Sequence, residues 1–257
     1  MDCKMKRMRS ILLSTIGLIL LAPLTLQASD WSYTVELYMF GTTIGGDTSF
    51  GRIDDADVDI DFSDILETLK LGGMIHFEAV QKTGWGAGLD YRLMDLENDI
   101  SGPRGGVADV GVRQGVLQGD LLYRVPLWKG DLDYVISFRW WNNDFDVTLD
   151  PAVLPGSFSA KASEDWIDLA VGARWTVPLS ESWSLMVRGD VGGLGLQSDF
   201  TAFLFADVKY AMTEHWLLDI GYTATWVDYE TGTPGQRGYF AYDTVTHGPL
   251  AGIIYKF

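Results

Sequence analysis

The segment His247-Gly-Pro-Leu-Ala-Gly-Ile-Ile-Tyr-Lys-Phe257 is the most informative part of this chain. Every second residue, counted back from Phe257, belongs to one apolar row, and such a period of two indicates a β-strand. Aromatic residues at the end of such a strand are typical of the interfacial belt of a membrane barrel. We therefore predict a closing barrel strand whose assembly signal is Pro249, Ala251, Ile253, Tyr255 and Phe257. The alternative is an edge strand of a soluble all-β domain.

The other end of the chain has the pattern of a secretory signal peptide. Four basic residues precede the apolar run Ile11–Leu26, and the small residue Ala28 follows shortly after it. The run contains Pro23 and is shorter than the roughly 20 apolar residues that cross a membrane as a helix. We predict cleavage after Ala28, which leaves residues 29–257 as the mature chain. Cleavage also removes Cys3, the single cysteine, so no disulfide is expected.

The charge of the chain argues against a nucleic-acid partner. Loss of residues 1–28 removes four basic residues and one acid, so the formal net charge of −16 becomes −19. A strongly acidic chain repels phosphate backbones, and no nucleic-acid binding is expected.

Short turns and long polar connections alternate along the mature chain. Three of the short turns end in a tryptophan, at Trp85, Trp183 and Trp216, and a fourth contains Trp128. Short periplasmic turns and longer external loops are typical of outer-membrane barrels. We predict an all-β, antiparallel up-and-down transmembrane barrel with both termini periplasmic, most simply of ten strands, with eight or twelve as alternatives. The expected strands are 31–44, 70–81, 85–97, 112–125, 132–141, 166–177, 183–193, 201–211, 216–228 and 241–257.

The two faces of these strands differ in charge. The rows predicted to face lipid, such as Leu132, Tyr134, Ile136 and Phe138, carry no charge. The opposite rows are rich in acids and bases, which a wet lumen can hold but a dry soluble core cannot. We predict a lumen charge network of Glu36, Glu78, Asp90, Arg92, Asp120, Arg124, Asp133, Arg139, Asp168, Arg174, Arg188, Asp190, Asp207, Lys209 and Asp219, with Lys256 on the same face.

Several short motifs resemble a family of bacterial outer-membrane β-barrel proteins, over nearly all of the mature chain. They are Phe62-Ser63-Asp64-Ile65-Leu66, Gly88-Leu89-Asp90-Tyr91, Gly189-Asp190-Val191-Gly192-Gly193 with Ser198-Asp199, and Gly248-Pro249-Leu250 before Tyr255-Lys256-Phe257. The resemblance implies a barrel fold and an outer-membrane location. It implies no activity and no catalytic residues.

The first long connection, residues 45–69, has unusual content. Its acids could bind a divalent cation through Asp55, Asp57, Asp59 and Asp61, or form an ordinary solvated loop. Ser63 is a suitable N-cap for a short helix over Asp64–Leu69, whose apolar side chains need a surface to cover. We predict that this helix could plug the lumen through Ser63, Asp64, Ile65, Leu66 and Leu69. The surface for it would be the glycines of the inward rows, which are Gly72, Gly86, Gly88, Gly172, Gly192, Gly221 and Gly252. The alternative is that these glycines only relieve crowding.

No catalytic constellation emerges from the sequence. The three histidines, His76, His215 and His247, are predicted in the lumen, a periplasmic turn and the external rim, so neither a triad nor a metal cage is expected. We expect no enzyme activity, no cofactor and no metal. The function predicted is a structural or narrow-channel barrel with a largely filled polar lumen. The alternatives are a small porin-like diffusion pore and a surface-binding barrel of the adhesin type. Expected partners are outer-membrane lipid, lipopolysaccharide and the outer-membrane assembly machinery.

Overall fold

The computed structural model describes residues 30–50, 53–60, 69–101, 107–150, 158–236 and 238–257. The predicted signal peptide lies outside the described residues. Within the described part of the chain, no helix is long and apolar enough to cross a membrane.

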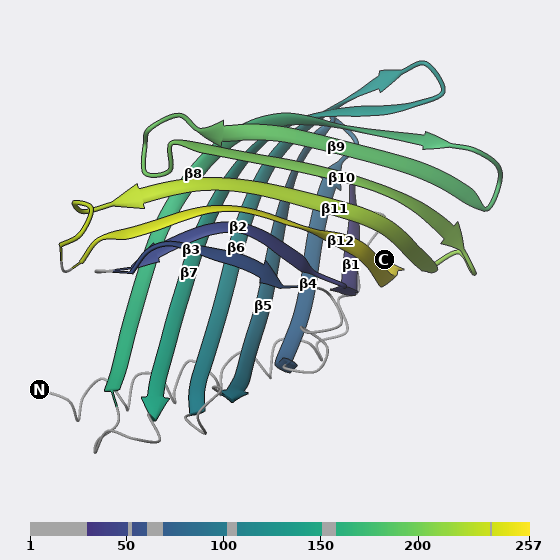
Figure 1. Cartoon of the computed structure of the whole chain (residues 1–257). Helices are drawn as coiled ribbons and strands as arrows, with labels where there is room; N and C mark the ends of the chain where they lie inside the picture. The colour runs from purple at the N-terminus through teal and green to yellow at the C-terminus, as the bar shows by residue number, and fades with distance from the viewer. Residues whose placement is uncertain (1–29, 51–52, 61–68, 102–106, 151–157, 237) are drawn as a thin grey trace, which may run out of the picture. The chain divides into compact units, whose positions relative to one another are not determined.

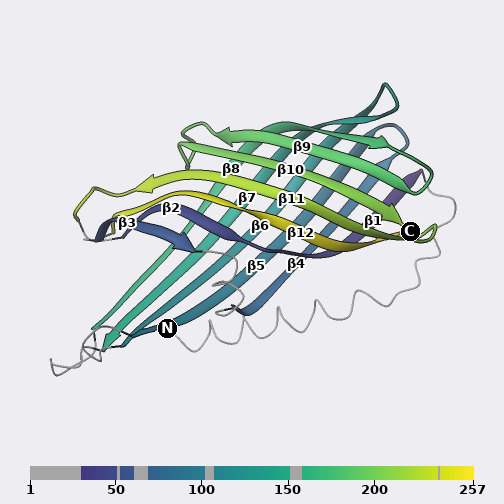
Figure 2. The same ribbon diagram turned by 45° about the vertical axis from the view of Figure 1, so that its right-hand side comes forward.

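Ten strands form a closed antiparallel barrel, in which each strand pairs with the next and the last returns to the first. Figures 1 and 2 show β4–β8 as one wall, with β9–β12 as the facing wall. The barrel confirms the predicted fold. Its strands are β1 (Trp31–Phe40), β4 (Leu69–Gln81), β5 (Trp85–Ser101), β6 (Val107–Leu127), β7 (Gly130–Asp150), β8 (Phe158–Pro178), β9 (Trp183–Gly193), β10 (Phe200–Ala211), β11 (Trp216–Thr231) and β12 (Phe240–Lys256).

The barrel strands have an exposed apolar face and a buried, largely polar face. On β11, Ile220 is 58% exposed whereas its neighbour Asp219 is 0% exposed. The outer surface is an apolar belt that includes Leu37, Met39, Ile75, Leu89, Leu121, Ile136, Phe138, Ile167, Val171, Leu204, Ile220 and Ile253. At the short-turn end an aromatic girdle follows, formed by Trp31, Trp85, Tyr123, Trp128, Trp183, Tyr210 and Trp216.

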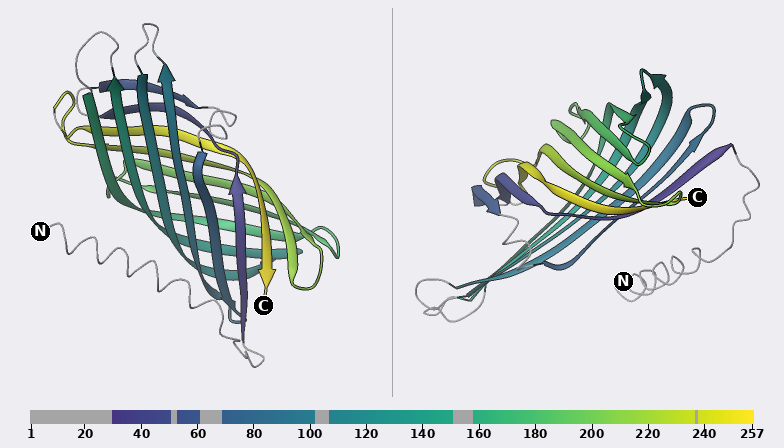
Figure 3. Two further views of the ribbon diagram at one scale, coloured as in Figure 1. Left: turned by 90° about the horizontal axis from the view of Figure 1, so that it is seen from below. Right: turned by 90° about the vertical axis from the view of Figure 1, so that its right-hand side faces the viewer.

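The prediction of a polar loop over residues 45–69 is wrong for most of that segment. Two strands, β2 (Thr43–Phe50) and β3 (Ile53–Ile60), form a hairpin there. β12 pairs with β1 along one half and with β2 along the other, so the hairpin continues the sheet beside β12 (Figure 3). Any side chain at Gly248 would collide with the backbone carbonyl of Gly41, at the step between β1 and β2.

The predicted helix Asp64–Leu69 is not settled by the fold. Its residues 64–68 lie outside the described residues, as do Ser63 and Asp61, while Leu69 begins β4. The plug formed by Ser63, Asp64, Ile65 and Leu66 therefore stays a prediction.

Several strands are longer than predicted. β6, β7 and β8 each have 21 residues, whereas a tilted strand crosses a bilayer in about 9–11. Much of the predicted connection 142–165 is therefore strand, because ladder hydrogen bonds continue after the apolar pattern has ended. The extra length lies at the end of the barrel opposite the short turns.

Candidate functional site: the charged bore

The centre of the bore is built around Asp190 on β9, which binds two arginines. Arg139 on β7 donates to one carboxylate oxygen of Asp190, and Arg188 donates to the other, at 3.2 Å. Arg188 also makes a two-pronged pair with Asp120 on β6, at 2.6 and 3.0 Å, and donates to Ser137 at 2.9 Å. All five side chains are buried. Successive side chains of a strand point to opposite faces of the sheet, and these five belong to the inward faces of their strands.

Gln118 and Phe203 complete this arrangement, which we call the arginine layer. The Gln118 side-chain oxygen accepts from Arg92 at 3.0 Å and from Arg139 at 2.8 Å, and its amide donates to Asp120 at 2.9 Å. The guanidinium carbons of Arg92, Arg139 and Arg188 lie 5.8, 5.3 and 5.5 Å from the centre of the Phe203 ring. Three cations therefore share one aromatic ring, within the range of cation–π attraction.

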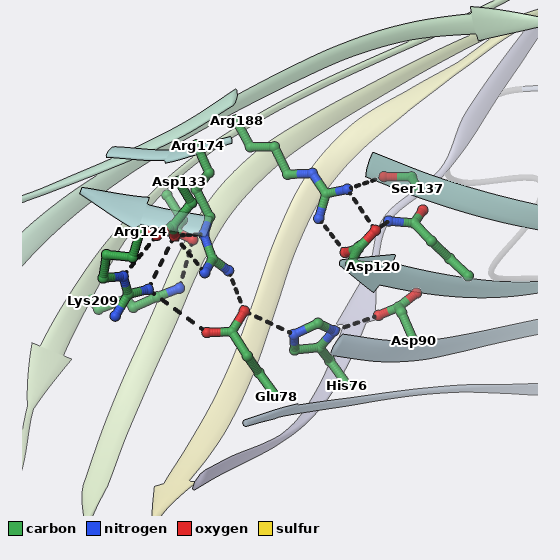
Figure 4. Close-up of polar contacts among 12 residues, drawn as sticks. His76, Glu78, Asp90, Asp120, Arg124, Asp133, Ser137, Arg174, Arg188 and Lys209 are labelled. Carbon is green, nitrogen blue, oxygen red and sulfur yellow. Dashed lines mark hydrogen bonds and ion pairs between the residues drawn. The ribbon is translucent and has the colours of Figure 1, made fainter. Parts of the chain in front are cut away.

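A second group of ion pairs lies toward the short-turn end (Figure 4). Asp133 accepts from Arg124 Nε at 2.7 Å and from Arg174 Nε at 2.8 Å. Arg174 also reaches across to Glu78 on β4, at 2.5 Å. His76 lies between Glu78 and Asp90, at 3.9 and 3.5 Å, and it links the two groups of charges.

Two acids share one lysine on the wall formed by β10 and β11, and a third acid lies near them on β1. Lys209 Nζ lies 2.8 Å from Asp207 and 3.3 Å from Asp219. Glu36 lies beside Asp219 and Lys209. A side chain at Gly252 would strike the Glu36 carboxylate, so this glycine makes room for a neighbouring side chain.

Asp168 is set apart from the ion pairs. It accepts a hydrogen bond from Ser198 and another from the Trp166 indole at 3.2 Å. The remaining fourteen predicted lumen residues on the barrel strands lie in or beside the ion-pair groups described above.

An aromatic cluster occupies the bore at the long-strand end. Trp166 is its centre, because its ring stacks on Tyr229 with centroids 4.2 Å apart and on Trp141 at 5.6 Å. Gln114 on β6 donates to the Tyr242 hydroxyl on β12 at 3.1 Å and so ties opposite walls together. The cluster consists of Val116, Trp141, Trp166, Val227, Tyr229, Phe240 and Tyr242, with Phe145 against it.

Two cavities of different size lie along the bore. The larger, about 310 Å³, lies in the short-turn half, and the smaller, about 30 Å³, lies near the aromatic cluster. Phe40 and Arg92 line both cavities. These two side chains therefore form the partition between them.

The residues of the bore that sequence reasoning missed are uncharged. Gln118, Phe203 and Trp166 all lie on inward rows, and none belongs to the predicted network. The alternation of the strand could have placed Phe203 on the lumen face, because Phe203 shares its row with Asp207 and Lys209.

The other predicted sites are distributed as follows. Pro249, Ala251 and Ile253 of the predicted assembly signal lie on the exposed outer face of β12, and Phe257, one residue past the end of β12, is also exposed. His247 contacts Tyr222, and His215 lies in the turn before β11, so neither is near His76. Among the described residues, no group of three or more His, Cys, Asp or Glu side chains is placed to hold a metal. Asp55, Asp57 and Asp59 lie on β3, whose side chains are outside that description.

Comparison with known proteins gives likeness of fold only. No protein-family model matches the chain, and no curated protein sequence matches it. The translocator domain of autotransporter NalP from Neisseria meningitidis is 11% identical over 98% of this chain and 96% of that one, with a TM-score of 0.47. Neisserial surface protein A is 13% identical over 89% and 98%, with a TM-score of 0.35. Ail of Yersinia pestis is 8% identical over 88% and 98%, with a TM-score of 0.39. These are outer-membrane β-barrels, and at such values the likeness assigns no ligand, partner or role.

Proposed function

We propose that this chain is an integral β-barrel protein of the bacterial outer membrane whose bore is closed to free diffusion, with a structural or narrow-channel role. One observation carries the proposal. The exposed surface of the barrel is an apolar belt with an aromatic girdle, whereas charged side chains such as Arg139 and Asp190 are buried inside. Water would favour the reverse arrangement, and lipid favours this one.

Contacts across the bore support closure. Arg174 on β8 is bonded to Glu78 on β4, and Gln114 on β6 to Tyr242 on β12. Ten strands enclose a space only a little wider than one that side chains fill completely. We therefore expect low or intermittent conductance in a planar bilayer. A steady, large conductance of the intact protein would contradict closure and favour the second candidate, a small diffusion pore. The 310 Å³ cavity is the observation that favours that pore.

The membrane location has its own test. The mature chain should fractionate with the outer membrane, and its migration on a detergent gel should change after boiling. Lipid and lipopolysaccharide would then surround the belt, the assembly machinery would engage β12, and both termini would face the periplasm. Deletion of Phe257 should reduce assembly more than Lys256→Gln does, because Phe257 is the exposed terminal aromatic. Recovery of the protein from the soluble periplasmic fraction would end this proposal.

The lipid face can be tested by substitution. Ile136 is exposed on β7 within the apolar belt, between Tyr134 and Phe138, so Ile136→Arg should cost about 2–4 kcal/mol of unfolding free energy in lipid. Lys129→Arg in the turn before β7 is the control, and it should cost almost nothing because that side chain is already charged and exposed. Reversible urea unfolding of both variants measures the difference. Equal costs would show that Ile136 does not face lipid.

A further inference from the structure

The larger cavity is lined by more bases than acids, although the network as a whole is richer in acids. Three carboxylates line it, from Glu36, Glu78 and Asp90. Six basic side chains line it, those of Arg92, Arg124, Arg174, Arg188, Lys209 and Lys256. The other acids of the network do not line this cavity.

Side-chain length explains the difference. The side chains of Asp133, Asp207 and Asp219 are 0% exposed, whereas Arg124 is 30% and Lys209 18% exposed. An aspartate holds its carboxylate close to the backbone, while arginine and lysine reach over it and turn their remaining N–H groups toward the cavity. The lumen surface therefore offers donors, and two of its three carboxylates are already paired, Glu78 with Arg174 and Asp90 with Arg92.

The mouth of the cavity has a cation that the network does not use. Lys256 lies at the end of β12, on the same face as the buried Ile254 and Leu250, and it lines the cavity. Within the described chain, no carboxylate pairs with Lys256. Arg124, the most exposed arginine of the ion pairs, lines the same cavity. Four hydroxyls near strand ends also line the cavity, from Ser32, Thr34, Thr176 and Ser184.

We propose that this cavity is a binding site for a small anionic solute that carries a phosphate, sulfate or carboxylate group, held at the mouth by Lys256 and Arg124. Charge-assisted N–H donors are the groups that recognise such oxygens. The volume of about 310 Å³ is at the lower end of the range for small-molecule sites, so the solute can be larger than an inorganic ion. The apolar side chains of Val80, Met186 and Leu217 would cover its uncharged part. This site goes beyond the proposed function, because binding does not require conduction.

The test is a calorimetric titration of the refolded protein with sodium sulfate and, separately, sodium phosphate. It is done in lipid-free detergent at constant ionic strength, so that a lipid headgroup cannot be the source of phosphate. We expect saturable binding. Lys256→Gln should weaken it by about tenfold or more, the effect of losing one charge-assisted hydrogen bond. Arg124→Gln should also weaken it, and Asp133 would keep Arg174 as its partner.

Lys129→Gln is the matched control. It removes the same charge from the same end of the barrel, but Lys129 is exposed in the β6–β7 turn and does not line the cavity. The affinity of the Lys129→Gln variant for sulfate and phosphate should equal that of the unmodified protein. The proposal is overturned if the unmodified protein shows no saturable binding of either anion, or if Lys256→Gln and Lys129→Gln bind equally. A shift in gel mobility on boiling verifies that each variant is folded. Should Lys256→Gln fail to fold, Arg124→Gln compared with Lys129→Gln decides in the same way.

Discussion

The two halves of the bore are filled by different chemistry. In the short-turn half, ion pairs surround a cavity of about 310 Å³. In the long-strand half, aromatic rings pack around Trp166, and the adjoining cavity is about 30 Å³. The boundary is abrupt: Arg139 lies opposite Asp168 on β8, and Trp141, two residues along β7, lies opposite Trp166. One inward row therefore changes from buried charge to aromatic packing within a single pleat.

This difference shows why the two halves depend on each other. A buried charge is stable only with its partners, and ion pairs become stronger where water is excluded. The aromatic cluster excludes water from one side of the arginine layer and needs no partner of opposite charge. Removing a partner should therefore be costly in the charged half, whereas the aromatic half should respond to lost volume.

The largest effect is expected for Asp190→Ala. This change removes a negatively charged partner from both Arg139 and Arg188, whose positive charges are buried. We expect a loss near the upper end of about 3–5 kcal/mol in the free energy of unfolding. Urea unfolding in detergent, followed by tryptophan fluorescence, measures it. The double variant Arg139→Met with Asp190→Leu should recover part of the loss, because no charge of that pair remains. No recovery would mean that the pair does not determine the cost.

Trp166→Ala should cost about 3 kcal/mol, because it removes packing at the centre of the aromatic cluster and leaves a cavity. The loss should not change with salt, since no ion pair is broken.

The arginine layer and the aromatic cluster each block the bore, one after the other along its length. We therefore expect Trp166→Ala alone and Arg92→Ala alone to leave bilayer conductance low. The double variant should raise it, because Arg92 separates the two cavities. A large conductance in either single variant would show that only one closure exists.

Sequence patterns could predict the barrel and its faces because a period of two is imposed by the strand itself. The charge on Asp120, Asp133 and Asp219 reveals the lumen face without any structure, since such groups cannot face lipid. The hairpin β2–β3 was missed for a physical reason. The alternation Ala56, Val58, Ile60 is a strand signal, but the aspartates between them are typical of a solvated loop, and the pairing that decides comes from β12, far away in sequence.

The partners inside the bore could not be predicted either. Which base binds Asp190 depends on stagger between strands: Gly172 and Phe203 lie opposite it in the ladders, while its ion pairs reach Arg139 on β7 and Arg188 two residues along β9. Side-chain reach, rather than register, selects these contacts.

Phe203→Leu should have an intermediate effect. It keeps an apolar side chain but removes the ring that Arg92, Arg139 and Arg188 share. Cation–π attraction of a desolvated ring is worth up to about 2 kcal/mol, and we expect a loss of about 1–2 kcal/mol. The control is Leu204→Phe on the exposed face of the same strand, which should be almost neutral in lipid. Unfolding of both variants in lipid vesicles measures this. If Phe203→Leu left the free energy of unfolding unchanged, the Phe203 ring would not stabilise the arginine layer.

The smallest effect is expected outside the bore, where acids lie opposite one another on the outer face beyond the apolar belt. In the strand register, Asp228 on β11 lies opposite Asp243 on β12, and Asp243 lies opposite Asp47 on β2. Burial, and then the carboxylates of Asp243, Asp199 and Glu230, raise the pKa of the Asp228 carboxyl.

A raised folded-state pKa means that the protonated group favours the folded state. This stabilisation is complete below the unfolded carboxyl value of about 4 and is lost as pH rises through the raised value. Asp228→Asn should therefore raise the melting temperature slightly at neutral pH and reduce the gain that the unmodified protein shows on mild acidification. Asp131→Asn, at the second position of β7 and at the opposite end of the barrel, is the control for charge removal alone. If both variants shift the melting curve equally at every pH, then general charge, and not the paired row of acids, sets the stability of this end.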